Sequence, residues 1–445
     1  MSLLVTVPFS DRRSTLLVLG VGIVVASLTV FFFIRSAGDS SSPENEVTKV
    51  YFADNISPAH RLIIAEFNRQ HRGDIEVVPV DLPFEKFSTN ERKELLARSF
   101  RSKSDKIDVF AVDLIWVPRF ARWSEPLDRY FTPAEQQQLL SYAIQSCRYD
   151  GRLVAMPMYI DVGLMYYRRD IIRRLPDGAA IEAEIQQSIS WDRFLQLRQR
   201  LGYQHKPYYI FQAKDYEGLV CNLLELAVER DSVLLSGTSF SVTAAPLQKA
   251  LAMLVDFVKT DVSPKRVVEF DEDMSYRYML DNDAVFVRGW PNFVEKFRGF
   301  YPDSLKLDAI GRAPLPHFEG RPPASVFGGW NLMVSRSSTK KEAAMEFIRF
   351  VESVPIQRML FEAGGYIPIM NGVYQDSAFM QTHPELLFYR DLLRKGFHRP
   401  AFVDYTRISA ILSYFGHLAI EQDLSVHDAL VKAEAMIRSN EVLVK

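Results

Sequence analysis

The chain has 445 residues, of which 48% are hydrophobic and 24% charged, and its formal net charge is −2. This length exceeds what one hydrophobic core normally serves, so we expect two domains of ordinary globular composition. The near-neutral charge disfavours a nucleic-acid-binding protein, which usually carries a basic excess.

The N-terminal region predicts a membrane segment. Residues 15–34 carry no charge, and twenty helical residues at about 1.5 Å each span the ~30 Å core of a bilayer. Arg12 and Arg13 precede them, which predicts a cytoplasmic N-terminus over 1–14 and an exported body. The apolar run is longer than that of most cleaved signal peptides, so an uncleaved anchor is favoured and a cleaved signal is the alternative. Residues 35–46 are typical of a flexible polar linker.

Strand and helix patterns alternate after this linker. The order strand, helix, strand, helix, strand predicts a parallel sheet covered by helices, over 47–53, 59–71, 75–80, 90–102 and 106–113. Ligands of such sheets bind outside the carboxyl ends of the strands. Asp113 ends the third strand and is therefore a candidate contact.

The rest of the chain is more helical. Ser190 is the expected N-cap of a helix that stops at Gly202, and a strand over 284–288 precedes a turn that carries Trp290. Cys147 and Cys221 could pair in an exported protein, but their segments favour two buried thiols.

The stretch "MPMYIDVGLMYY", residues 156–167, contains a single charge, Asp161. An unpaired buried carboxylate is costly, so Asp161 has a structural partner or faces a cavity. Tyr159, Trp290 and Trp330 also follow or end predicted strands. Aromatic rings beside carboxylates suit a sugar, because hydrogen bonds to a charged group contribute about 1.5–3 kcal/mol each.

Other interpretations of these residues remain open. Trp290 and Trp330 are also compatible with a hydrophobic core, and Asp161 with a cap or an ion pair. The sequence lacks the short motifs of common hydrolases, metalloproteases and nucleotide-binding loops. Carboxylate pairs have no such motif, so Asp113, Asp161 and Glu217 could serve a glycoside hydrolase.

Seven stretches occur in the order found in one family: "FAVDLIWVPRF…EPLD", "GRLVAMPMYIDVGLMYYRRD", "DYEGLVCNLLE", "DNDAVFVRGWPNF", "APLPHFEG", "FGGWNLMVS…AAMEFIRFVES" and "ALVKAEAMI". From about Val47 onward the chain resembles the extracellular solute-binding proteins of ATP-driven sugar importers, especially their trehalose/maltose-binding branch. The resemblance implies an α/β, two-lobe, type II periplasmic-binding-protein fold that closes about a hinge. Lobe one would be 47–156 plus 327–372, and lobe two 157–326 plus 373–445.

The resemblance also implies the residues that contact the sugar. They are Thr89, Arg92, Asp113, Tyr159, Asp161, Trp290, Gly328, Trp330 and Arg399. The aspartates would accept hydrogen bonds, the tryptophans would stack on the sugar, and Arg399 would donate. Gly328 would permit close approach of the backbone, and Thr89 and Arg92 match less securely.

One loop departs from the family pattern. The branch carries an acidic residue after the first strand, where this chain has Ile56 or Pro58 within "DNISPAH". We expect one half of a disaccharide site to lack a charged acceptor. A glycoside with one glucosyl unit and a smaller second part, such as glucosylglycerol, fits that loss better than trehalose, sucrose or maltose.

The expected function is therefore a monomeric, membrane-tethered receptor in the periplasm or an equivalent extracytoplasmic space. It would capture a small neutral glycoside and deliver it to ABC permease subunits, without catalysis, metal, cofactor or nucleic acid. A sugar sensor of the same fold is the alternative among binding proteins.

Overall fold

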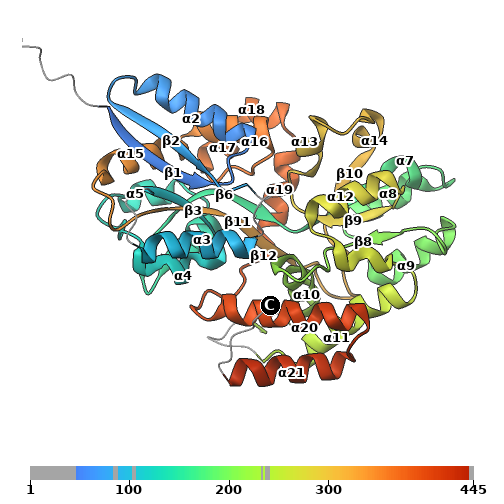
Figure 1. The fold of residues 1–445 in the computed structure, drawn as a ribbon. Coiled ribbons are helices and arrows are strands. Elements are labelled where there is room, and N and C mark those ends of the chain that lie inside the picture. The colour runs from blue at the N-terminus through green and yellow to red at the C-terminus, as the bar shows by residue number, and fades with distance from the viewer. Residues whose placement is uncertain (1–46, 84–88, 103–106, 232–233, 236–240, 440–445) are drawn as a thin grey trace, which may run out of the picture. The chain divides into compact units, whose positions relative to one another are not determined.

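The computed structural model describes residues 47–445, apart from 84–88, 103–106, 232–233, 236–240 and 440–445 (Figure 1). The predicted N-terminus, anchor and linker, 1–14, 15–34 and 35–46, lie outside the described residues. None of the helices in the described ranges combines the length and apolar character needed to span a bilayer.

The predicted alternation of strands and helices is confirmed in the first part of the chain. Strands β1 (Thr48–Asp54), β2 (Ile75–Asp81) and β3 (Val109–Asp113) are parallel, with helices α2 (Pro58–Gln70) and α3 (Thr89–Arg101) between them. Figure 1 shows the two helices on opposite sides of this sheet. Each strand therefore ends at the same edge, where Asp54 and Asp113 lie.

Three later strands complete a six-stranded sheet in the order β12-β11-β3-β1-β2, with β6 paired to β11. Strand β11 (Ser325–Val334) runs antiparallel to both β3 and β6 (Met156–Val162), and parallel to the short β12 (Gly396–Phe397). All ten residues of β11 are buried, as expected for the centre of a sheet.

A second sheet has the order β10-β7-β9-β8. Its strands are β7 (Leu164–Arg168), β8 (Tyr209–Ile210), β9 (Phe286–Gly289) and β10 (Ile310–Ala313). The chain passes from the first sheet to the second at Gly163, between β6 and β7. A Cβ atom there would lie 1.9 Å from Glu225 Oε1 and 2.8 Å from Arg288 Nη2, so this crossing requires glycine.

Long helices pack together in the second half of the chain. They are α10 (Glu217–Arg230), α11 (Ala245–Lys259), α20 (Tyr405–Glu421) and α21 (Val426–Arg438). Ser190 caps α9 (Trp191–Arg200) as predicted, by accepting a hydrogen bond from the Arg193 amide. Both cysteines are buried and free.

The remaining described helices are short to medium in length. They are α4 (Val117–Phe120), α5 (Pro133–Gln137), α6 (Ser141–Gln145), α7 (Arg169–Ile172), α8 (Gly178–Gln186), α12 (Glu272–Asp281), α13 (Phe293–Arg298), α14 (Ser304–Asp308), α15 (Lys341–Val351), α16 (Val354–Gly364), α17 (Asn371–Gln375), α18 (Ser377–Thr382) and α19 (Glu385–Leu393).

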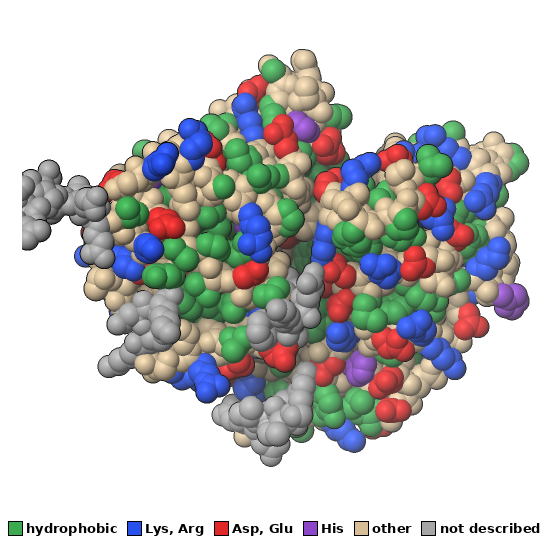
Figure 2. Space-filling model, turned by 45° about the horizontal axis from the view of Figure 1, so that its top comes forward, with side chains coloured by type: hydrophobic (Ala, Val, Ile, Leu, Met, Phe, Trp, Pro, Cys, Tyr) green, Lys and Arg blue, Asp and Glu red, His purple; other side chains and the backbone are tan. Residues whose placement is uncertain are grey.

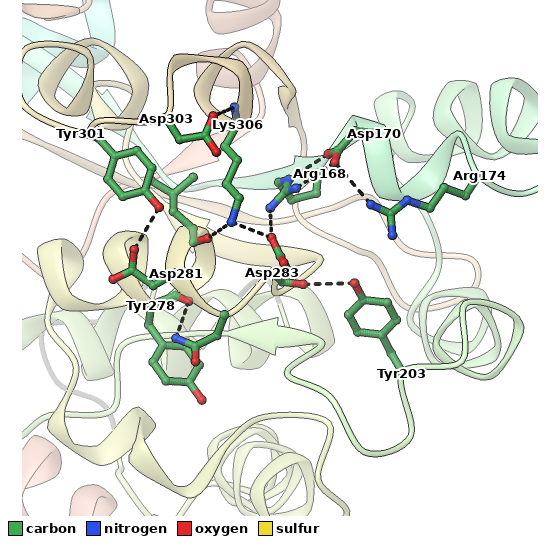
Figure 3. A network of polar contacts seen from close by, with 12 residues as sticks. Arg168, Asp170, Arg174, Tyr203, Tyr278, Asp281, Asp283, Tyr301, Asp303 and Lys306 are labelled. Atoms are coloured by element: carbon green, nitrogen blue, oxygen red, sulfur yellow. Dashed lines mark hydrogen bonds and ion pairs between the residues drawn. The ribbon is translucent and has the colours of Figure 1, made fainter.

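A polar network fastens the end of β7 to the segments around α12 and α14 (Figure 3). Arg168 donates to Asp283 at 2.8 Å and to both carboxylate oxygens of Asp170, and Lys306 lies 2.9 Å from Asp283. Burial would raise the pKa of Asp283, but the bonds from Arg168 and Lys306 outweigh it and lower that pKa. This network is structural, since its members hold the second sheet to its covering helices.

Candidate functional site

The two crossing strands bring several predicted site residues side by side. In the antiparallel β6–β11 pair, Asp161 lies opposite Gly328 and Tyr159 opposite Trp330. On the other side of β11, Trp330 lies opposite Asp113, the last residue of β3. Residues from three separate stretches of sequence therefore share one part of the first sheet.

Trp290 reaches this cluster from the second sheet. A Cβ atom on Gly328 would lie 2.9 Å from the Trp290 ring and 3.2 Å from Asp161 Cβ, so the indole rests beside both residues. Its Nε1 donates to Glu272 Oε1 at 3.2 Å, and the Arg288 guanidinium lies 4.0 Å from the ring centroid. These two contacts fix the orientation of the ring before any ligand arrives.

The Asp161 carboxylate has no hydrogen bond or ion pair with any residue that the structure describes. Burial, and next the nearby Asp113 charge, raise its pKa to about 7 against the opposing effect of Arg288. Asp161 is thus a partly desolvated acceptor without a protein donor. The structural alternative, in which Asp161 is a cap or an ion-pair partner, is not what the described residues show.

Arg399 bridges two carboxylates from distant parts of the chain. Its Nη2 donates to Asp113 at 3.0 Å and its Nη1 to Glu217 at 2.9 Å, and its side chain is only 2% exposed. Tyr405 also donates to Glu217, at 3.0 Å. Arg399 thus holds Asp113 and Glu217 in place, and the direct sugar contact that the resemblance assigns to it stays a prediction.

The Trp330 side chain is more buried than expected for a ring that only stacks on a sugar. It is 9% exposed, and the Arg92 guanidinium lies 4.4 Å from the centroid of its ring. Trp116 packs against it edge to face, with ring centroids 5.4 Å apart. Arg92 in turn donates to Asp54 Oδ1 at 2.8 Å. Trp330 and Arg92 therefore form one packed layer beneath the strand ends.

The other two predicted residues differ in how far they can be placed. Tyr159 is buried, and its ring lies 4.4 Å from that of Tyr366. Thr89 is the first residue of α3, but its side chain lies outside the described part of the structure. The sugar contacts of all nine residues remain predictions.

Sequence reasoning missed several residues that support this site. Glu217 was considered only as a possible catalytic acid, and Arg288, Glu272 and Tyr366 were not considered. Arg288 makes a buried ion pair with Glu225, at 2.8 Å, directly under Trp290. Its position two residues before Trp290 was the only available signal.

Figure 2 shows a hollow in the surface, between the part of the molecule built on the first sheet and the part built on the second. Acidic and basic side chains both occur along its walls. An opening between two α/β units, with strands crossing beneath it, is a frequent place for a ligand site.

Comparison with known proteins identifies this architecture. A family model described as "Bacterial extracellular solute-binding protein" matches residues 51–358. The chain belongs to the bacterial extracellular solute-binding protein family. This chain is also similar to a "Probable ABC transporter-binding protein" of Deinococcus radiodurans. The two are 23% identical over 335 residues, which cover 74% of this chain and 77% of the relative.

Solved structures show the same fold. The maltose-bound MalE3 of T. maritima matches with a TM-score of 0.79 and 25% identity, over 89% of this chain and 100% of that one. The GacH receptor of Streptomyces glaucescens, solved unliganded and with acarbose, matches with a TM-score of 0.75 and 18% identity, over 88% and 98% of the two chains. The predicted two-lobe, type II periplasmic-binding fold is therefore confirmed.

The family and fold are those of transport-binding proteins that serve ABC transporters. Members of the family are extracellular proteins that bind a solute.

Proposed function

We propose that this solute-binding protein captures a small neutral glycoside for an ATP-driven importer. The observation that carries the proposal is the Asp161 carboxylate, which lies beside the fixed Trp290 ring and lacks a protein donor. Sugar hydroxyls supply the missing donors, and the apolar face of a sugar ring packs on an indole. The maltose-bound and acarbose-bound relatives support a sugar as the ligand class.

The charges around the site favour a neutral ligand. Burial, and next the nearby charge of Asp113, raise the pKa of Asp161, so the site already disfavours negative charge at this position. The two buried arginines nearby, Arg288 and Arg399, are paired with Glu225 and with Asp113 and Glu217. An anionic sugar would therefore meet carboxylates without a free guanidinium to offset them.

Binding would be coupled to closure of the hinge. A ligand that contacts Asp161 from the first sheet and Trp290 from the second binds the closed arrangement better than the open one, and so shifts the population toward closure. The closed form then docks on the permease. The expected N-terminal anchor would keep the receptor near that permease.

The loop after β1 bears on which glycoside is bound. Asp54 is its nearest acid, but its Oδ1 accepts from Arg92 and from the Asn55 amide. Asp54 is also only 2% exposed. We therefore expect this half of the site to lack an accessible acidic acceptor, which favours glucosylglycerol over a full disaccharide. Calorimetric titration with glucosylglycerol, trehalose, sucrose and maltose tests this ranking. Tighter binding of any of the three disaccharides would contradict it.

A glycoside hydrolase is disfavoured by the same contacts. Asp113 and Glu217, two of the three candidate acids, share the Arg399 guanidinium and so are poorly placed to donate a proton. Incubation with disaccharides should release no monosaccharide. Sustained release would overturn the proposal in favour of an enzyme.

A further inference from the structure

A second pocket lies behind the crossing strands. Its volume is about 960 Å³, and it is lined by residues of α5, α6, α17 and α19, together with Arg148 and Arg394. That volume is at the upper end of the range typical of small-molecule sites, about 300–1,000 Å³. The pocket is distinct from the cluster around Asp161, because none of the nine predicted sugar contacts lines it.

The direction of the β11 side chains shows that this pocket and the cleft lie on opposite faces. Gly328 faces Trp290 and Asp161, and successive side chains of a strand point to opposite faces. Phe327 therefore points away from the cleft, and its ring stacks on Tyr142 of the pocket, with centroids 5.6 Å apart.

The pocket is basic. Three arginines line it, Arg148, Arg390 and Arg394, and no described lining residue is acidic. Their nearest carboxylates give little compensation. Arg148 Nη1 lies 4.0 Å from Asp128, and its Nη2 donates to Gln136 of the pocket. Arg390 Nε lies 4.0 Å and Arg394 Nη1 3.5 Å from Asp391, whose side chain is 64% exposed. Ion pairs of this length and exposure are weak.

Two side chains of the pocket offer hydrogen-bond donors. Arg390 makes no hydrogen bond through Nε with any described residue, but that atom is buried, so a ligand would contact the guanidinium at its Nη atoms. Burial raises the pKa of Tyr142 to about 12, against the opposing charges of Arg394 and Arg390, so its hydroxyl is a neutral donor near both guanidinium groups. Guanidinium groups with a neutral donor are the usual partners of phosphate oxygens.

One wall of the pocket contacts both sheets. Helix α19 packs on β6 and β11 of the first sheet, and its Tyr389 donates to the Pro291 carbonyl, just after β9 of the second sheet, at 3.2 Å. Helix α6 begins where the Leu140 amide donates to the Ile369 carbonyl, on the side of the first sheet. A ligand held between α6 and α19 would therefore contact a helix that joins the two sheets, on the face opposite the cleft.

We propose that this pocket binds a small phosphate-bearing anion from solution, held by Arg148, Arg390 and Arg394 between α6 and α19. The inference is independent of the proposed sugar ligand. Such an anion stabilises the arrangement of the two sheets that brings these arginines together, and so acts on closure from the face opposite the cleft.

The test is calorimetric titration of the purified full chain with inorganic pyrophosphate, at constant ionic strength. We expect saturable binding that weakens at least tenfold in the double variant Arg390→Gln/Arg394→Gln. The matched control is Arg298→Gln/Arg438→Gln, which removes two exposed arginines outside the pocket. The control variant and Asp161→Asn should both bind pyrophosphate as the unmodified protein does.

Hydrogen exchange locates the site independently of the variants. Pyrophosphate should slow amide exchange in both Ser141–Gln145 and Glu385–Leu393. The proposal is overturned by absence of saturable binding, by equal loss of binding in the control variant or in Asp161→Asn, or by protection confined to other segments.

Discussion

At the residue scale, Asp161 links the sequence to the proposed chemistry. Replacing it with Asn keeps the shape but removes the negative charge that accepts hydroxyl donors. We predict that Asp161→Asn weakens binding of the transported sugar roughly 10–100-fold, measured by calorimetry, with the fold intact.

Asp308→Asn is the matched control, since Asp308 pairs with Arg298 on an exposed surface. Unchanged affinity in Asp161→Asn, together with a lower melting temperature, would show that Asp161 is a structural residue.

The raised pKa of Asp161 predicts a second effect of the same substitution. Burial raises this pKa to about 7 in the folded protein, above its ordinary value of 3.8. The unfolded chain therefore releases the proton first, and the contribution of Asp161 to stability falls as pH rises from about 4 to about 7. We predict that Asp161→Asn stabilises the ligand-free protein by roughly 1–3 kcal/mol at pH 8 and little at pH 4. Thermal melts at both pH values test this; equal effects at both would contradict it.

Individual residues of the site were predictable only where local pattern exposed them. Asp161 was conspicuous as the one charge in an apolar run, and Trp290 as an aromatic after a strand. The partners of Arg399 could not be predicted, because Glu217 and Asp113 lie 182 and 286 positions away from it in the chain. Contacts at such separations depend on the packing of the two sheets and leave no periodic signal.

At the element scale, the crossing at Gly163 is the most constrained point. A methyl group there meets the Glu225–Arg288 ion pair, whose side chains are 4% and 0% exposed and cannot move into solvent. We predict that Gly163→Ala costs roughly 3–5 kcal/mol of unfolding free energy, because it breaks a buried pair. Denaturant titration measures this.

Gly299→Ala is the control for that variant, since a Cβ atom there meets nothing within 4 Å. It should change stability by less than about 1 kcal/mol. A comparable loss in both variants would mean that the ion pair yields to the added methyl group.

The network of Figure 3 gives an acid-dependent prediction for the second sheet. Asp283 has a positive φ of 51°, which Asn also tolerates, so Asp283→Asn isolates the charge. Its pKa is lowered on folding, so its stabilisation is present at neutral pH and is lost as pH falls through the folded pKa. Because the Asp283 side chain is 57% exposed, we predict a loss of only about 1 kcal/mol at pH 7, which diminishes as the pH falls below the ordinary carboxyl pKa of 3.8. A pH-independent loss would contradict this.

Helices and strands could be predicted from the sequence where capping residues and the spacing of apolar residues indicated the same element. The βαβαβ start and the Ser190 cap follow the sequence closely. The register of β6 on β11, with its irregularity between Trp330 and Asn331, could not be derived, because both strands are apolar on both faces. Side-chain alternation, which normally sets register, is absent from such strands.

At the scale of the whole molecule, the order of the family-like stretches predicted the two-sheet fold correctly. The fold does not predict which sugar is bound, because structures with this same architecture bind maltose in one case and acarbose in another. We propose that a few side chains decide which sugar fits, among them Asp54, which accepts a hydrogen bond from Arg92. The lobe boundaries also remain predictions.

The central claim is that a neutral glycoside occupies the cleft beside Asp161. Native mass spectrometry of the freshly isolated protein tests it directly. We predict a bound species with the mass of a small neutral glycoside, which is lost on dialysis and is absent from Asp161→Asn prepared in the same way. A bound amino acid, peptide or other non-carbohydrate species that persists in Asp161→Asn would contradict the claim.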